Sequence, residues 1–366
     1  MRENSGRWSV RVTGATATAT LLLGLATTAS PAGAPAAVDL AAPTKATISA
    51  TAPGTAAAGS AVSAVKAHSR TARAGTRTTA RWIGSLNVTN EAAVNSAYWS
   101  LYATKQSSLV QWLGGSLPLC LPGLTSLFSN GQTLTSLNFV RSLAGLAPVA
   151  FSPSLNASAQ LAALIMAANN GLDHHPTSAW RCWTRTGATA ASKSNLALAW
   201  PSLASGEIID LYMDDRGSTN TAAGHRRWIL NPFSTVMGSG STRTSNALTV
   251  IGPSSAARPN PAWIGWPSAG YFPNKMEPGG RWSLSSGLKS VSFARASVAV
   301  FLGTHRFKVH KFAVEGGYAQ PTIVWQMPAS FPKTGDYRVV VSGIHRAGMR
   351  KALKVAYTVR LFTPSH

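Results

Sequence analysis

The sequence predicts an α+β protein in which a helix-containing domain is followed by a β-sandwich. Two observations support this: apolar residues recur at helical spacing between about residues 133 and 252, whereas short alternating runs of β-prone residues dominate residues 288–366. A chain of 366 residues exceeds the size at which a single core usually stops growing. We therefore expect two domains together with some unpacked sequence.

The N-terminal region carries targeting and linker signals. Arginines precede a short apolar stretch at residues 21–29, and small residues follow it, which predicts a signal peptide over residues 1–37. The apolar run is shorter than the roughly 20 residues that span a bilayer, so we expect no transmembrane span in the mature protein. Residues 38–81 are rich in Ala, Thr, Ser and Pro, which predicts a disordered linker.

The segment 82–132 contains aromatic residues and leucines, and it predicts an ordered lead-in that packs onto the next domain. One of the two cysteines of the chain, Cys120, lies in this segment, and the other is Cys182. An even pair of cysteines in an exported chain predicts one disulfide, with two unpaired thiols as the alternative.

Helices and one unusual carboxylate are expected in the first domain. Helical spacing marks residues 134–143, and a Ser-Pro start signal precedes a second helix over residues 155–170 that is apolar on nearly all sides. Residues 205–215 also project as a helix, in which Asp215 falls on the apolar face. A carboxylate on a buried face needs a partner, so Asp215 is expected to have one.

The periodicity changes after residue 252. Residues 253–287 are rich in Trp, Pro and Gly, and we expect an irregular connector there. Alternating runs between turn signals then fill residues 288–366, for example Tyr337, Val339 and Val341. This pattern is typical of a small antiparallel sandwich similar to an immunoglobulin-like domain.

The chain is strongly basic, with 33 Lys and Arg residues against 11 Asp and Glu residues and a formal net charge of +22. Such a charge favours anionic partners, which for an exported protein means an anionic cell-wall polymer or a lipid ligand. A generally basic solvated surface is the alternative. The basic residues are scattered and accompany no nucleic-acid motif, so we expect no specific nucleic-acid partner.

Histidines and carboxylates gather in one stretch of this acid-poor chain. The acidic residues of the stretch are Asp173, Glu207, Asp210, Asp214 and Asp215, and the histidines that bracket them are His174, His175 and His225. Two imidazoles and a carboxylate are a suitable donor set for zinc or another divalent ion, with a position left for water or substrate.

Several short motifs in this region occur in a characteristic order. They are LNFVRSLAGL, the Asp173-His174-His175-Pro176 turn, SNLA from Ser194, LYMDD ending at Asp215, GHRRWIL from Gly224 and MGSG from Met237. Together they resemble the bacterial exported branch of the CAP superfamily, or SCP domains, the relatives of cysteine-rich secretory proteins, antigen 5 and pathogenesis-related proteins. The resemblance covers residues 133–252 and implies an α/β/α sandwich with a groove that holds two histidines and two acidic residues.

The resemblance assigns the ligand-groove positions in this chain. His174 matches the first groove histidine, with His175 as a competing candidate, and His225 matches the second. Asp215 replaces a family glutamate, and Ser194 stands where many relatives have the other glutamate. Because one carboxylate is missing, we expect His174, Asp215 and His225 to bind a divalent metal such as zinc only weakly.

The resemblance implies a secreted binding or interaction protein, extracellular or associated with the cell envelope, whose groove takes a peptide, glycan or lipid ligand. One alternative is a metal-assisted hydrolase in which the bound ion activates water. Another is a structural cell-envelope protein. The hydrolase lacks an obvious general base, and Ser194 lacks the GxSxG context of a serine nucleophile, so the sequence identifies no catalytic residue.

Overall fold

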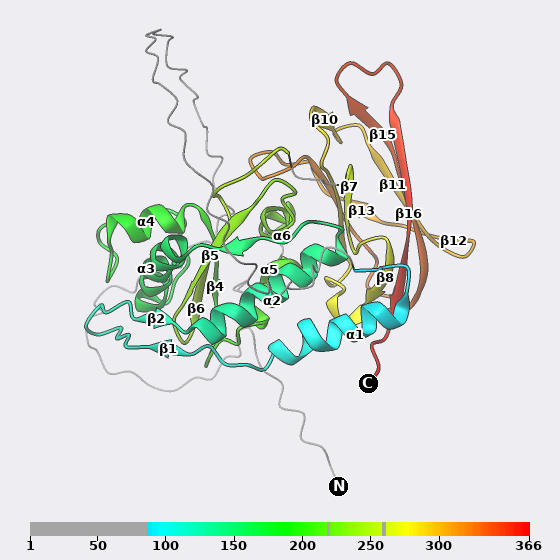
Figure 1. The fold of residues 1–366 in the computed structure, drawn as a ribbon. Helices are drawn as coiled ribbons and strands as arrows, with labels where there is room; N and C mark the ends of the chain where they lie inside the picture. The colour runs from blue at the N-terminus through cyan, green and yellow to red at the C-terminus, as the bar shows by residue number, and fades with distance from the viewer. Residues whose placement is uncertain (1–85, 218–219, 258–260) are drawn as a thin grey trace, which may run out of the picture.

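The computed structural model describes residues 86–217, 220–257 and 261–366. The predicted signal peptide, 1–37, and the predicted linker, 38–81, lie outside the described residues. Figure 1 shows a part built of helices and a sheet beside a β-rich part that contains β15 and β16. The observed class is α+β, as predicted. In the described ranges, no helix is long and apolar enough to cross a bilayer.

The described part of the predicted lead-in, from residue 86 onward, contacts both parts of the molecule. Its elements are α1 (Glu91–Leu101), η2 (Ala103–Lys105), β1 (Trp112–Leu113) and β2 (Leu124–Thr125), the last two forming an antiparallel hairpin. The Asn90 side chain caps α1 by accepting a 2.9 Å hydrogen bond from the Ala93 N–H. The Tyr271 N–H donates a 2.7 Å hydrogen bond to the Val88 carbonyl, so the lead-in also touches the β-rich part.

The predicted disulfide between Cys120 and Cys182 is present. It ties the β1–β2 hairpin to the loop that precedes α4 (Arg185–Ala191). The bond therefore holds the lead-in against the next part of the chain, as expected from the position of Cys120.

The helix-containing part is built around one four-stranded sheet with the order β3-β5-β6-β4. Helices α3 and α4 pack on one face of this sheet, and α2, α5 and α6 lie on the other (Figure 1). The bounds of these elements are α2 (Leu127–Leu143), β3 (Ala150–Phe151), α3 (Pro153–Asn169), β4 (Ser194–Leu198), α5 (Glu207–Asp214), α6 (Gly224–Ile229), β5 (Val236–Ser241) and β6 (Ser245–Thr249).

Two of the predicted helices are present, and one of them begins earlier than predicted. Helix α3 matches the expected helix over residues 155–170. Helix α2 begins at Leu127 rather than near residue 134, because the Ser126 side chain caps it by accepting a 3.1 Å hydrogen bond from the Ser129 N–H. The first turns of α2 were missed because Leu127 and Phe128 are exposed and break the inward apolar spacing.

Glycines in the MGSG motif allow α3 to approach β5 closely. A Cβ atom at Gly240 would lie 2.1 Å from the Gln160 backbone nitrogen, and one at Gly238 would lie 2.4 Å from the Leu155 Cβ. Any larger residue would therefore push α3 away from the sheet. The packing of one helix on one strand explains why both positions are glycine.

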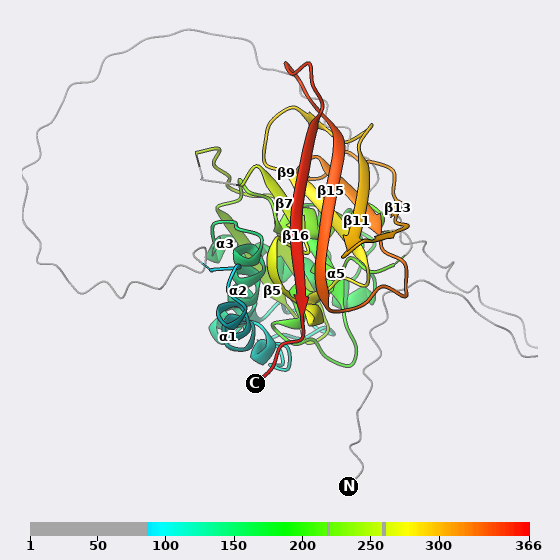
Figure 2. The same ribbon diagram turned by 90° about the vertical axis from the view of Figure 1, so that its right-hand side faces the viewer.

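The β-rich part consists of two sheets, ordered β12-β11-β15-β16-β8 and β13-β14-β9-β7, with β10 pairing to β15. Figure 2 shows the long strands β15 and β16 side by side, with β11 next to β15. The strand bounds are β7 (Trp263–Trp266), β8 (Gly270–Pro273), β9 (Arg281–Ser286), β10 (Val291–Ser292), β11 (Ser297–Leu302), β12 (His305–Phe307), β13 (His310–Lys311), β14 (Thr322–Gln326), β15 (Gly335–Arg346) and β16 (Leu353–Phe362). The two sheets meet through the buried rings of Trp282 and Tyr337, whose centroids are 5.5 Å apart.

The prediction of an irregular connector over residues 253–287 is wrong. This segment contributes β7 and β9 to one sheet and β8 to the other, and it also contains the short turn η3 (Asn274–Met276). The strands were missed because Pro, Gly and Trp obscure the alternation that marks a strand. Trp266 and Trp282 instead supply core side chains, and both are fully buried.

The two parts share a core and a set of buried arginine contacts. One continuous cluster of buried apolar side chains includes Phe139 in the first part and Trp325 in the second. Arg226 of α6 is 1% exposed and reaches across the junction, where its Nη1 donates to the Arg281 carbonyl at 2.8 Å and to the Ser283 hydroxyl at 3.2 Å. Its Nε donates to the Met213 carbonyl at 2.7 Å. The Arg226 side chain thus joins α5, α6 and β9.

We expect Arg226→Ala to lower the free energy of unfolding by about 3–5 kcal/mol, because several buried carbonyls would lose their donor together. Arg226→Lys should recover only part of this loss, since an ammonium group lacks the planar guanidinium fork. Urea unfolding measures both. Arg360→Ala is the control, because the exposed Arg360–Asp336 ion pair should change stability by less than about 1 kcal/mol. If Arg226→Ala and Arg360→Ala lowered the free energy of unfolding equally, the proposed stabilisation of the junction by Arg226 would be contradicted.

Candidate functional site

The Asp215 carboxylate is the buried centre of the candidate site. Helix α5 ends at Asp214, and Asp215 follows in the left-handed conformation with φ 48°. This turn directs the side chain inward, where the residue is 1% exposed. Its Oδ1 lies 2.7 Å from the His225 Nδ1, and its Oδ2 accepts a 2.9 Å hydrogen bond from the Arg226 N–H. The sequence prediction that Asp215 faces inward and has a partner is confirmed.

His225 lies on α6 with its imidazole held between a charge and a ring. The Asp215 carboxylate can only accept from Nδ1, so this nitrogen carries a proton, and within the described ranges Nε2 forms no hydrogen bond. The Tyr212 ring stacks beside the imidazole at a centroid distance of 5.6 Å and an interplanar angle of 29°. The His225 side chain is 28% exposed. The imidazole is therefore accessible to a ligand, while Asp215 fixes its tautomer and Asp215 and Tyr212 together fix its orientation.

His174 is the inward member of the two adjacent histidines. Its Nδ1 lies 3.1 Å from the Ala191 carbonyl, and its Nε2 forms no hydrogen bond with the residues that the structure describes. Burial lowers the pKa of His174, and the nearby His225 imidazole lowers it further. His175 is exposed instead, and its backbone N–H donates to the Asp173 carboxylate at 2.7 Å. His174 is thus the more buried of the two adjacent histidines, and its imidazole lies within electrostatic range of His225.

Ser194 differs from the expectation that it contributes to an open groove. The residue is 4% exposed, and its hydroxyl donates to the Ala190 carbonyl at 2.7 Å and contacts the Thr249 hydroxyl at 3.0 Å. Both partners lie within the fold, so the hydroxyl has a structural use. A glutamate at this position would bury its carboxylate against the Ala190 carbonyl, so we expect Ser194→Glu to destabilise the protein rather than to complete a metal site.

The predicted three-ligand metal set is not assembled. Among the described residues, no group of three or more His, Cys, Asp or Glu side chains is placed to hold a metal ion. Asp215 instead accepts from His225 Nδ1 and from the Arg226 N–H, so it orients an imidazole rather than acting as a ligand beside it. The residues present do not fit a zinc site built from His174, Asp215 and His225.

Two site residues were not identified from the sequence. The Tyr212 hydroxyl donates to the Asn195 carbonyl at 3.0 Å and to the Asn246 Oδ1 at 2.9 Å, which fixes the ring that supports His225. The Asn195 Nδ2 donates to the His225 carbonyl at 3.1 Å. Tyr212 lies within the LYMDD motif and Asn195 within the SNLA motif. Neither side chain is charged, so the pattern of carboxylates and histidines does not mark them as site residues. Their roles depend on contacts between β4, α5 and α6.

A second acidic group lies on α5 beside the lead-in. The Tyr102 hydroxyl donates to the Asp210 Oδ1 at 2.8 Å. Burial raises the pKa of Asp210 to about 7, and the negative charge of Asp214 adds to this effect. Burial also raises the pKa of Asp214, although its ion pair with Arg216 opposes the shift. Asp210 is therefore a weakly acidic carboxyl group away from the imidazoles.

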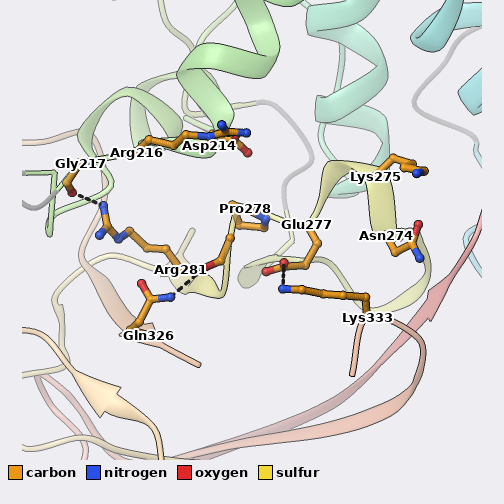
Figure 3. A pocket seen from close by; sticks show the side chains of 11 residues that line it. Asp214, Arg216, Gly217, Asn274, Lys275, Glu277, Pro278, Arg281, Gln326 and Lys333 are labelled. Atoms are coloured by element: carbon orange, nitrogen blue, oxygen red, sulfur yellow. Dashed lines mark hydrogen bonds and ion pairs between the residues drawn. The ribbon is translucent and has the colours of Figure 1, made fainter. Parts of the chain in front are cut away.

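A polar pocket of about 600 Å³ opens at the junction of the two parts (Figure 3). Its charged lining residues are Asp214, Arg216, Lys275, Glu277, Arg281 and Lys333. Arg216 pairs with Asp214, and Lys333 pairs with Glu277 at 2.9 Å. The remaining cations, Lys275 and Arg281, give the lining a positive balance that suits an anionic group. His174 and His225 do not line this pocket.

The geometry defines a helix–sheet–helix domain that presents an imidazole oriented by a buried carboxylate. Residues 134–251 match the model of the cysteine-rich secretory protein family, CAP, and this part of the chain is a CAP domain. The match lies within the range predicted from the motifs. In general terms, membership of this family indicates an interaction protein of the extracellular type. A comparison with curated proteins gives no matching sequence.

We expect Asp215→Asn to release the His225 tautomer, because an amide can donate or accept a hydrogen bond where the carboxylate only accepts. Long-range proton–nitrogen correlation of the imidazole should detect mixed Nδ1–H and Nε2–H forms. The free energy of unfolding should also fall by about 1–3 kcal/mol. Asp336→Asn is the control, since that carboxylate is 67% exposed and should affect neither measurement. An unchanged single tautomer in Asp215→Asn would contradict the orienting role of Asp215.

We expect Asp210→Asn to stabilise the protein at pH 8 by on the order of 2 kcal/mol. The folded-state pKa of Asp210, about 7, exceeds the ordinary value of 3.8, so protonation favours folding. The stabilisation by this group is complete below pH 3.8 and is lost as the pH rises through 7. Urea unfolding between pH 4 and pH 8 should therefore show that the free energy of unfolding of the variant, relative to that of the wild type, increases as the pH rises. A constant difference would contradict the shifted pKa.

Proposed function

We propose that the protein is a secreted binding protein of the cell envelope whose CAP domain holds a ligand at His174 and His225. The observation that carries this proposal is the hydrogen bond between His225 and the buried Asp215. It orients a partly exposed imidazole before any ligand arrives, which lowers the ordering cost of binding. Among the described residues, the Nε2 atoms of His174 and His225 form no hydrogen bond, so each can bond to the hydroxyl, amide or acidic groups of a peptide, glycan or lipid headgroup.

Binding is favoured over hydrolysis by the composition of the site. A metal-assisted hydrolase needs an ion that activates water, and the set of His174, Asp215 and His225 does not fit such an ion. A serine hydrolase needs an accessible nucleophile beside the histidine, whereas the Ser194 hydroxyl is used inside the fold. The site therefore offers an oriented imidazole that can form hydrogen bonds with a bound ligand.

Secretion and envelope association form part of the same proposal. The export signal predicted from the sequence and the disulfide support an oxidising location outside the cytosol. Residues 288–366 hold more than a third of all Lys and Arg residues but only two acidic residues, Glu315 and Asp336. This uneven distribution favours attachment of the C-terminal part to an anionic wall polymer, with the CAP domain left to engage its own ligand.

We further propose that the β-rich part is immunoglobulin-like. The orders β7-β9-β14-β13 and β12-β11-β15-β16 correspond to the ABED and C′CFG sheets of such domains. The Tyr337 hydroxyl also donates to the Pro332 carbonyl near the start of β15, as in a tyrosine corner. On this assignment the domain begins near residue 263, earlier than the predicted residue 288.

Titration of the isotopically labelled protein tests the binding proposal. The probes are a defined peptide library, oligosaccharides of N-acetylglucosamine and a short-chain phosphatidylglycerol, each followed through the His174 and His225 side-chain resonances. We expect one class to perturb both resonances and His225→Asn to weaken its binding about tenfold, as one lost hydrogen bond implies. His310→Asn, which changes an exposed histidine of β13, is the control and should bind normally.

Two other outcomes would favour a different function. Release of product from any probe that stops in both His225→Asn and Asp215→Asn would identify a hydrolase. If no probe class perturbs either histidine, while the protein sediments with isolated wall material at low salt only, the protein is a structural envelope component. Either result would overturn the ligand-binding role of the CAP domain.

A further inference from the structure

The lead-in exposes an unusual number of large apolar side chains. Eleven large hydrophobic residues of the described chain are exposed, and seven of these lie between residues 109 and 128. They are Leu109 (61%), Leu113 (49%), Leu119 (70%), Leu121 (47%), Leu124 (55%), Leu127 (90%) and Phe128 (55%). Single exposed leucines are ordinary, but a concentration of this kind marks an interaction surface.

The exposed leucines lie on one continuous stretch of chain that comprises the β1–β2 hairpin and the start of α2. Leu113 and Leu124 are direct partners across the ladder, so their side chains lie on the same face. Leu121 pairs with Ser116 at the end of the hairpin, next to Leu119. Figure 1 places this hairpin at the edge of the molecule remote from β15 and β16. We refer to residues 109–128 as the leucine hairpin.

The shape of the leucine hairpin is determined by packing, so the exposure is part of the folded state. The Trp112 ring lies over Gly115, where a Cβ would be 2.0 Å from a ring atom, and its Nε1 donates to the Pro122 carbonyl at 2.8 Å. Gly123 has a positive φ of 55° and passes close to the Leu113 carbonyl. The Cys120 disulfide then holds the tip. The leucines are thus held outward by a fixed backbone.

Charge is absent from the leucine hairpin and present around it. No Asp, Glu, Lys or Arg occurs between Lys105 and Arg141. Arg181 lies next to Cys182, which is bonded to the hairpin tip, and it is exposed. The exposed Arg243 is linked to the hairpin through Leu203, because the Leu203 N–H donates to the Arg243 carbonyl and the Leu203 carbonyl accepts from the Val110 N–H. Neither arginine forms an ion pair within the described residues.

We propose that the leucine hairpin docks on the surface of an anionic lipid bilayer, with its leucines among the acyl chains and the flanking arginines at the headgroups. Aliphatic side chains without hydrogen-bonding groups suit acyl chains, and nearby cations suit anionic headgroups. This inference does not depend on the ligand of the CAP domain, since the imidazoles are not part of the hairpin.

Two other occupants fit the same surface less well. A second copy of the chain that covered the same surface would bring four flanking arginines to one interface with no acidic residue of the hairpin to pair with them, and like charges would oppose the contact. A protein partner usually meets anchors such as Trp, Tyr and Arg, whereas six of the seven exposed side chains here are leucines. The chemistry of the surface therefore favours lipid.

Sedimentation with lipid vesicles tests the proposal on the full chain with its disulfide intact. Vesicles of equal parts phosphatidylcholine and phosphatidylglycerol should bind the wild type, and the double variant Leu119→Ser/Leu121→Ser should lower the partition coefficient about tenfold or more. The variant Arg181→Gln/Arg243→Gln should lower it about tenfold on these vesicles. On vesicles of phosphatidylcholine alone, the arginine variant should behave as the wild type does.

Met349→Ser is the matched control, because Met349 is 46% exposed on the β15–β16 hairpin at a different place in the fold. Its binding should equal that of the wild type. All the substituted side chains are exposed, so equal urea midpoints should verify folding. Unchanged vesicle binding by the leucine variant, or a loss confined to Met349→Ser, would overturn the proposal. So would a concentration-dependent dimer in the absence of lipid that the leucine variant abolishes, because a second copy would then cover the hairpin.

Discussion

The buried carboxylate of Asp215 is the interaction on which the candidate site and the junction both depend. Its two oxygens bind the His225 Nδ1 and the Arg226 N–H, and its backbone carbonyl accepts a 2.7 Å hydrogen bond from the Arg281 Nη1. A negative charge in the interior is tolerated only when its lone pairs are satisfied. That requirement joins the end of α5 to the start of α6, and the backbone carbonyl of the same residue adds strand β9, which lies more distant in the sequence.

Buried arginines meet a second requirement of this fold. Its irregular segments end in carbonyl groups that no helix or sheet satisfies, and a guanidinium can donate to several of them at once. Arg226 and Arg281 do so across the junction, and Arg227 donates to the carbonyls of Glu315 and Gln320 in the β-rich part. Much of the charge in this weakly charged CAP domain therefore has a structural use, whereas many cations of the C-terminal part are exposed.

The site is simpler than the four-residue groove implied by the family resemblance. Of the four positions that the resemblance assigns to the groove, Ser194 is bonded inside the fold and Asp215 is occupied by His225 and Arg226, whereas the two imidazoles are not used in this way within the described residues. The polar junction pocket and the leucine hairpin lie elsewhere, so the molecule carries three chemically different surfaces. One surface presents imidazoles, one is polar with a positive balance, and one is aliphatic.

The sequence by itself determined the α+β class, the disulfide, helix α3 and the residues at the centre of the site, because periodicity, cysteine number and short motifs are local properties. Only the tertiary structure decided the strands within residues 253–287, where Trp and Pro obscure alternation, and the early start of α2. It also decided that Asp215 orients His225, that Ser194 faces away from any open groove and that Tyr212 supports the imidazole. Those roles depend on which segments meet in space, and no spacing along a chain specifies the direction of a side chain across a packed interface.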